Sequence, residues 1–123
     1  MRLRRIEFVD RVAEPSEIER YAKFLRHYVW KTDKGRVVVM PIVSERGDDI
    51  YWQARVYKKG VAGYLAFNKD TAKMIGLSDE DFMIVQETMH LLESEFRASP
   101  TVEKAKIIEL LRAELKPREV ATP

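Results

Sequence analysis

The sequence predicts an α+β fold, in which a four-stranded antiparallel meander packs on helices and amphipathic helices form the C-terminal end. Segments rich in β-branched and aromatic residues fill residues 28–67 and alternate with short glycine-containing turns. Two longer segments after residue 78 carry apolar residues at helical spacing. The 123 residues, 46% of them hydrophobic, suffice for one core. We therefore expect a single domain over residues 1–116, followed by a disordered tail over residues 117–123.

The first predicted helix begins at about Glu17 and ends near His27. Pro15-Ser16-x-x-Glu19 has the pattern of a capping box, and apolar residues continue after it at helical spacing. Before this helix, Arg2 to Val9 alternates only loosely. That segment is typical of an edge strand or of an extended basic arm.

Four strands are then predicted from the turns that separate them. Each turn contains a glycine, at Asp33-Lys34-Gly35, at Gly47 within residues 45–49, and at Lys58-Lys59-Gly60. The expected strands are Tyr28–Trp30, Val37–Val39, Ile50–Lys58 and Val61–Phe67.

Three further helices are predicted after the strands. A short helix follows Asn68 and is closed by Gly76, and a long helix is capped by Ser78. The expected core stripe of the long helix comprises Phe82, Val85, Met89, Leu92 and Phe96, widened by Ile84 and Leu91. Thr101 is expected to cap the last helix, with an apolar stripe of Val102, Ala105, Ile107, Ile108, Leu110, Leu111 and Leu115.

The width of that last stripe predicts a homodimer joined through the C-terminal helix, because a single helix of this length is marginally stable without packing. The alternative is a monomer in which the last helix folds back on the long one.

Composition excludes several classes of protein. The chain has no Cys, so it has neither disulfides nor thiolate metal sites. Glu87-x-x-His90 matches half of a di-iron motif without a second copy, and no phosphate-binding glycine loop is present. We therefore expect no metal, no cofactor and no enzyme activity.

The expected location is the cytoplasm. No apolar run is long enough to span a membrane, and charge interrupts the first ten residues before a signal-peptide core can form. Scarce Asn and Gln beside 34% charged residues favour a thermophilic source.

Positive charge is concentrated in the first half of the chain. Residues 1–60 hold 14 Lys and Arg against 9 Asp and Glu, whereas residues 61–123 hold 8 against 11. Because the first half also contains most of the predicted strands, the sheet is the expected place for a polyanion to bind.

The predicted strand at residues 50–59 separates two kinds of side chain. Alternation places Ile50, Trp52, Ala54 and Val56 on one face and aromatic, polar or cationic residues on the other. Bases of single-stranded nucleic acid stack on aromatic rings while cations contact the phosphates. The predicted nucleic-acid-binding residues are Tyr28, Trp30, Tyr51, Gln53, Arg55, Tyr57, Lys58, Lys59 and Tyr64, with Tyr28, Trp30 and Tyr64 included if they share that face.

Two other interpretations of these patterns stay open. Tyr, Arg and Lys also suit the solvent face of any antiparallel sheet, and large aromatics such as Trp30 and Trp52 are more often buried in a core. In that case the amphipathic helices would make the chain a protein-interaction or assembly subunit.

The basic, aromatic meander, with Tyr51, Arg55, Tyr57 and Lys59 on one strand face, resembles the ThermoDBP family of archaeal single-stranded DNA-binding proteins. The resemblance rests on element order and composition. It implies stacking and basic residues in a cleft, sequence-tolerant binding of single-stranded DNA, and a dimer formed by the C-terminal region.

A shorter segment, Gly63 to Leu77, is similar to the strand, short helix and Gly-Leu of AbrB-type transcription factors, which are duplex-binding dimers with swapped hairpins. Phe67-Asn68 stands where that family has Ile-Pro, and helical spacing continues after the segment where the family needs a strand.

Overall fold

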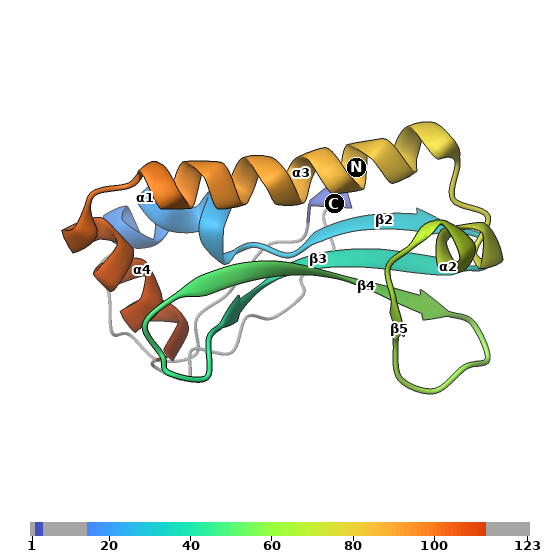
Figure 1. Cartoon of the computed structure of the whole chain (residues 1–123), viewed down its shortest axis with the longest axis horizontal. Coiled ribbons are helices and arrows are strands. Elements are labelled where there is room, and N and C mark those ends of the chain that lie inside the picture. The colour runs from blue at the N-terminus through green and yellow to red at the C-terminus, as the bar shows by residue number, and fades with distance from the viewer. Residues whose placement is uncertain (1, 4–14, 113–123) are drawn as a thin grey trace.

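The computed structural model describes residues 2–3 and 15–112, with side chains from residue 19 to residue 112, and there it shows one antiparallel sheet and four helices (Figure 1). Their order confirms the predicted α+β architecture. The elements are β1 (Arg2–Leu3), α1 (Pro15–Leu25), β2 (Tyr28–Thr32), β3 (Gly35–Val43), β4 (Ile50–Lys58), β5 (Leu65–Ala66), α2 (Lys69–Met74), α3 (Asp79–Ala98) and α4 (Thr101–Arg112).

The strands form a meander in which each pairs antiparallel with its neighbours in the sequence, in the order β1 to β5. The longest pairing joins β3 and β4 over nine residue pairs, from Gly35 opposite Lys58 to Val43 opposite Ile50. The predicted edge strand exists at Arg2 and Leu3, which pair with β2. The rest of that segment, Leu115 and the predicted tail lie outside the described residues, as does the side chain of Ser16, whose backbone belongs to α1.

The last predicted strand was too long. We expected Val61–Phe67, but only Leu65 and Ala66 pair with β4. Gly60 and Gly63 have φ angles of 81° and 72°, in the left-handed region where glycine is favoured. Residues 60–63 therefore turn instead of extending beside the end of β4. Because β5 ends at Ala66, the edge of β4 before Arg55 also has no strand beside it among the described residues.

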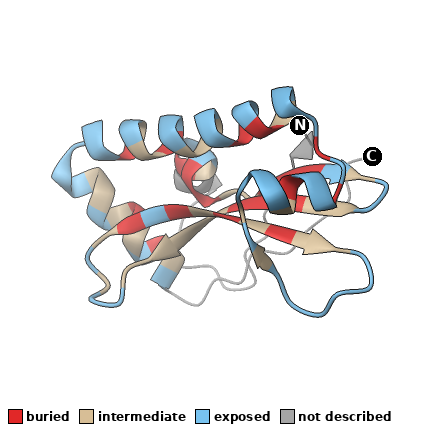
Figure 2. Ribbon diagram, turned by 45° about the vertical axis from the view of Figure 1, so that its right-hand side comes forward, coloured by how far each residue is buried: buried red, intermediate tan, exposed pale blue. Residues whose placement is uncertain are grey.

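One face of the sheet forms the core (Figure 2). Its buried side chains come from β2, β3 and β4, and all four helices pack against them. The rings of Phe24, Trp52 and Phe96 meet near the middle of this core, with centroids 5.8–6.0 Å apart. Aromatic contacts at this spacing add to the stability that burial of apolar surface provides.

Helix α3 begins at the predicted cap, since Ser78 Oγ accepts a hydrogen bond from the Asp81 N–H at 3.1 Å. Phe82, Val85, Leu92 and Phe96 are buried as predicted, and Met89 is partly buried against the core. Ile84 and Leu91 do not widen this stripe, and the Leu91 side chain is 59% exposed. Successive residues of a helix are rotated by about 100° around its axis. Ile84 and Leu91 therefore point away from the buried stripe and toward the outer side of α3. Neither α3 nor any other described helix is long and apolar enough to cross a membrane.

Helix α4 packs within its own chain. Ile107 and Leu110 are fully buried in the core, and Ile108 and Leu111 pack against it. The packing contacts are mainly with α1 and β3. The homodimer was predicted because α4 needs to bury apolar side chains, and the core of the same chain already buries several of them. The homodimer itself stays a prediction.

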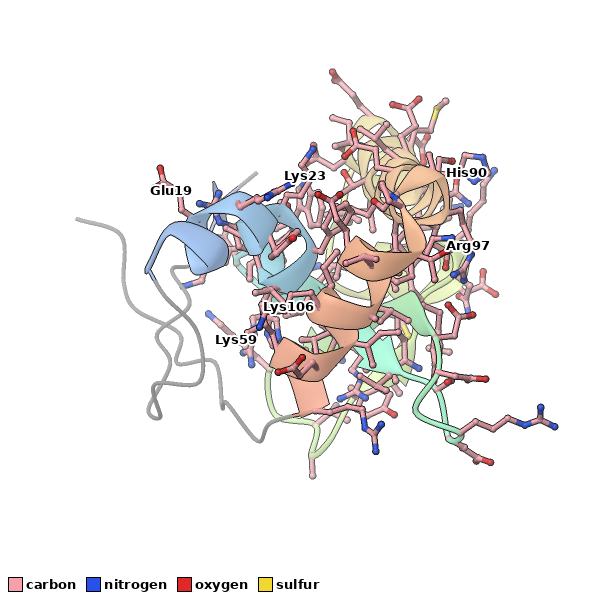
Figure 3. The ribbon with its side chains drawn as sticks, turned by 90° about the vertical axis from the view of Figure 1, so that its left-hand side faces the viewer. Glu19, Lys23, Lys59, His90, Arg97 and Lys106 are labelled. Atoms are coloured by element: carbon pink, nitrogen blue, oxygen red, sulfur yellow. The ribbon has the colours of Figure 1, made fainter. Side chains whose placement is uncertain are left out.

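The end of α3 is tied to the start of β4 by Arg97 (Figure 3). Arg97 Nη2 donates to the Ile50 carbonyl at 3.1 Å, and Nη1 donates to Asp49 Oδ1. Partial burial raises the pKa of the Asp49 carboxyl, but the hydrogen bonds from Arg97 and from the Ile50 N–H outweigh it. The pKa of Asp49 therefore lies below its usual value.

We expect Phe96→Ala to lower the free energy of unfolding by about 3–5 kcal/mol, because it removes a ring from the fully buried aromatic cluster. Urea unfolding followed by circular dichroism measures the change. Val102→Ala on the exposed face of α4 is the control, with an expected change within about 0.5 kcal/mol. Equal effects of the two substitutions would contradict this core.

We expect Asp49→Asn to reduce the acid sensitivity of the fold. A carboxyl with a lowered pKa in the folded state contributes stability above its unfolded pKa, and that contribution is lost as the pH falls through the folded pKa. Urea unfolding at about pH 5 and about pH 2.5 should show a smaller loss of stability in the variant than in the unsubstituted protein. Asp33→Asn, in the exposed β2–β3 turn, controls for the change of charge alone.

Candidate nucleic-acid interface

The face of the sheet opposite the core carries most of the predicted binding residues. We call it the open face and define it by Lys31, Arg36, Tyr51, Gln53, Arg55, Tyr57 and Tyr64. Val29 and Val38 point to the same side but are buried. The exposed part of the open face therefore extends along β4 and across the end where β2, β3 and β4 meet the loop before β5.

A row of cations and aromatic rings crosses the open face. The register places Lys31 opposite Arg36 and Arg36 opposite Tyr57, and the rings of Tyr57 and Tyr64 lie 6.1 Å apart. The Arg36 guanidinium lies 4.4 Å from the centre of the Tyr57 ring. The Arg55 guanidinium lies 4.2 Å from the centre of the Tyr64 ring. These are cation–π pairs, so each arginine is held over an aromatic ring.

The other predicted residues of β4 extend this row along the strand. Gln53 Oε1 accepts a hydrogen bond from Arg55 Nε at 2.9 Å, which fixes the direction of both side chains. Tyr51 is exposed, six residues before Tyr57. Since a strand rises about 3.3 Å per residue, the two tyrosines lie about 20 Å apart along the open face.

A groove of about 500 Å³ lies at the cationic end of the row. We call it the basic groove. Its lining contains four cationic side chains and no carboxylate, and the Arg36 Nε–H there is buried with no hydrogen-bond partner among the described residues. The lining residues are Lys31, Thr32, Gly35, Arg36, Tyr57, Lys58, Lys59, Val61 and Gly63.

The hairpin beside this groove depends on Gly35. A Cβ atom at this position would lie 2.1 Å from the backbone oxygen of Tyr57, closer than any real contact. Only glycine therefore allows β3 to start this near β4, and that close approach brings Arg36 opposite Tyr57.

Tyr28 and Trp30 were predicted to extend the aromatic platform, and this prediction was wrong. Both lie on the core face, where they are 8% and 4% exposed. The Tyr28 hydroxyl donates to the Lys23 carbonyl at 2.9 Å, and burial raises the pKa of this phenol. Alternation gives the reason, since the register pairs Tyr28 with Val39 and Trp30 with Val37, both core residues.

The prediction from sequence missed Lys31 and Arg36. Both could have been found from the turn, because a two-residue hairpin loop at Asp33-Lys34 places residues 31 and 36 opposite each other. With Trp30 assigned to the core, alternation then directs Lys31 to the open face.

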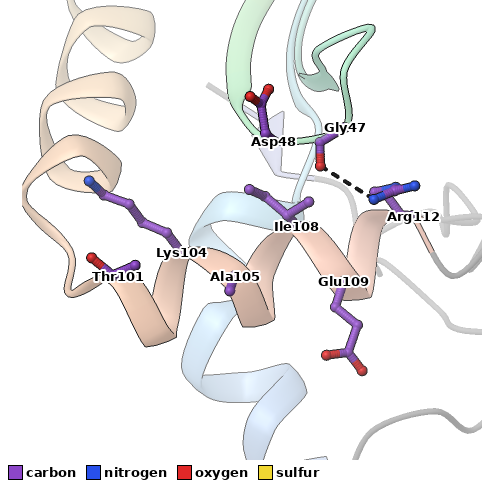
Figure 4. Close-up of a pocket in the computed structure, with 8 residues that line it drawn as sticks. All are labelled: Gly47, Asp48, Thr101, Lys104, Ala105, Ile108, Glu109 and Arg112. Atoms are coloured by element: carbon purple, nitrogen blue, oxygen red, sulfur yellow. Dashed lines mark hydrogen bonds between the residues drawn. The ribbon is translucent and has the colours of Figure 1, made fainter.

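A larger cavity than the basic groove lies elsewhere, between the β3–β4 turn and α4 (Figure 4). It has a volume of about 670 Å³. Its lining contains two acidic residues, Asp48 and Glu109, and two basic residues, Lys104 and Arg112. Mixed charge makes it a poor site for a polyanion. Within the described part of the chain, no group of three or more His, Asp or Glu residues is arranged to hold a metal ion.

The AbrB-type resemblance requires a strand after Leu77. The chain instead forms the 20-residue helix α3 there. No protein-family model, curated protein or solved structure matches this chain.

Proposed function

We propose that this protein binds single-stranded DNA with little sequence preference through its open face and basic groove. The proposal is carried by one observation, the groove that adjoins Tyr57, whose described lining contains Lys31, Arg36, Lys58 and Lys59 and no carboxylate. Phosphates are the ligands that such a cluster attracts, and Tyr57 leads directly to the exposed ring of Tyr64.

Single strands suit this surface better than duplexes because their bases are available for stacking. A guanidinium covers one side of the Tyr57 ring and one side of the Tyr64 ring, which leaves at most one side of each for a base. Tyr64 is 47% exposed and is the most accessible ring beside the groove. Stacking on aromatic rings tolerates any base, so the expected selectivity is for strandedness and not for sequence.

We expect a labelled oligo(dT) to bind with a dissociation constant below about 10⁻⁴ M at low salt, measured by fluorescence anisotropy. Lys59→Ala should reduce the slope of log K against log[salt] by about 0.7, the value for one phosphate contact to a single strand. Tyr64→Ala should weaken binding by about 5- to 150-fold with little change in slope, because it removes stacking and no charge.

Arg46→Ala is the matched control for the loss of a cation. Arg46 is exposed in the turn at the opposite end of the β3–β4 hairpin, so its removal should leave both affinity and slope nearly unchanged. Absence of binding at low salt would refute the proposal. Stronger competition by duplex than by single-stranded DNA would contradict the expected preference for single strands.

A second candidate function, assembly, is favoured by the outward face of α3. Met83, Ile84 and Leu91 are large apolar side chains exposed on this helix. Contiguous exposed apolar surface is uncommon on monomers and marks contact surfaces. For the predicted homodimer, this face is an alternative to the stripe of α4, in which Ile107 and Leu110 are buried and Val102 is exposed.

If α3 joins two copies, light scattering at micromolar concentration should give twice the 14.4 kDa of one chain. Leu91→Glu should then restore the single-chain mass, because it places a charge in the contact. Val61→Glu, at an exposed apolar residue in the loop before β5, should leave the mass unchanged. A single-chain mass for the unsubstituted protein would exclude this assembly at that concentration.

A further inference from the structure

We propose that a cavity at the edge of β4 receives one nucleobase of the strand that the open face binds, and this inference rests on the proposed function. The cavity has a volume of about 350 Å³. We call it the edge cavity. It is lined by Trp52, Gln53, Ala54, Tyr64, Ala66, Phe67 and Met89.

The edge cavity exists because β5 is short. Among the residues of β4, only Arg55 and Val56 pair with β5, so the edge at residues 52–54 has no strand beside it. On the other side, Glu93 of α3 accepts a hydrogen bond from the Trp52 N–H at 3.4 Å. One turn before Glu93, Met89 lines the cavity, which therefore lies between the end of β5 and α3.

The walls of the edge cavity suit a flat aromatic ligand. They contain the side chains of Trp52, Tyr64 and Phe67, and Phe67 is itself stacked on Phe82 with ring centroids 4.7 Å apart. Met89 adds a polarizable thioether, which makes favourable contacts with aromatic rings. Cavities that bind small planar ligands have volumes from about 300 Å³ and are mostly apolar.

Gln53 supplies a hydrogen-bond donor at the edge cavity. Gln53 Oε1 already accepts from Arg55, so its side-chain NH₂ remains to donate. The Trp52 indole Nε1–H is buried and has no hydrogen-bond partner among the described residues. A base offers carbonyl oxygens and ring nitrogens as acceptors for the Gln53 NH₂, and its flat ring also fills the space between the apolar walls, which a sugar-phosphate chain without bases does not.

The edge cavity is continuous with the proposed binding surface. Tyr64 and Gln53 belong both to the open face and to the lining of the cavity. A DNA strand with its phosphates in the basic groove would pass Tyr57 and Tyr64 and reach the edge cavity next. This order of contacts is why we assign the cavity to a base of the same strand.

Trp52 fluorescence tests the inference directly. The chain has two tryptophans, so Trp30→Phe leaves Trp52 as the only indole. We expect oligo(dT) to change the Trp52 emission of this variant as it binds. An abasic oligonucleotide of equal length, which offers the same phosphates without bases, should leave the emission unchanged even where anisotropy shows that it binds.

Ala66→Leu tests the same point by filling the cavity. Ala66 is exposed, so a larger side chain there is expected to keep the fold, which circular dichroism checks. We expect about a tenfold loss of affinity for oligo(dT), as for one lost stacking contact, with affinity for the abasic oligonucleotide unchanged. Ala62→Leu, in the exposed loop and outside the lining, is the control and should bind like the unsubstituted protein.

The outcomes separate this inference from the proposed function. If oligo(dT) binds while Trp52 emission stays constant and Ala66→Leu binds normally, the edge cavity takes no base and the proposed function stands. If oligo(dT) does not bind at all, the proposed function fails and the inference fails with it. If Ala66→Leu does not fold, the emission of the Trp30→Phe variant decides alone.

Discussion

The register between β3 and β4 is the constraint on which the rest of the structure depends. Nine consecutive pairs fix which side chains of both strands face the helices. Because alternate residues point to opposite faces, a slip of one residue would carry Trp52 and Val56 to solvent and Arg55 and Tyr57 into the core. Because Trp52 and Val56 are buried on the core face, Arg55 and Tyr57 must lie on the open face. Gly35 anchors this register at one end, since no other residue fits against the backbone of Tyr57.

The division between the two faces also explains the arrangement of the helices. All four pack on the core face, where Phe24, Trp52 and Phe96 meet. The carboxylates at the start of α3 lie on this helical layer, whereas the basic groove has none in its lining. On the helical layer acids are paired with cations, as in Arg20 with Glu103 and Lys23 with Glu95, whereas the cations of the basic groove have no carboxylate beside them in the described lining. A protein with a formal net charge of only +2 can therefore still present a local cationic cluster.

Alternation within one strand was predicted correctly from the sequence, whereas the pairing of β2 with β3, which the loop at Asp33-Lys34 fixes, was not used. The residues Tyr51, Gln53, Arg55 and Tyr57 do share a face, as predicted, because a period of two needs no information beyond the strand itself. The error at Tyr28 and Trp30 arose because their face depends on pairing with Val39 and Val37. The edge cavity was out of reach, since it results from the early end of β5 and from the position of Met89 on a helix distant in the sequence.

The arginines and lysines of the proposed interface are held in different ways, and this difference has a mechanical consequence. Arg36 and Arg55 lie over tyrosine rings, and Arg55 also donates to Gln53, so their rotamer freedom is already reduced before a ligand arrives. Lys59 is exposed beside the groove, on a long flexible stem. An interface whose planar groups are ordered in advance loses less entropy on binding, because only the lysines must still be fixed by a phosphate. The aromatic residues thus serve two purposes, since the same rings that orient the arginines offer their remaining surface to bases.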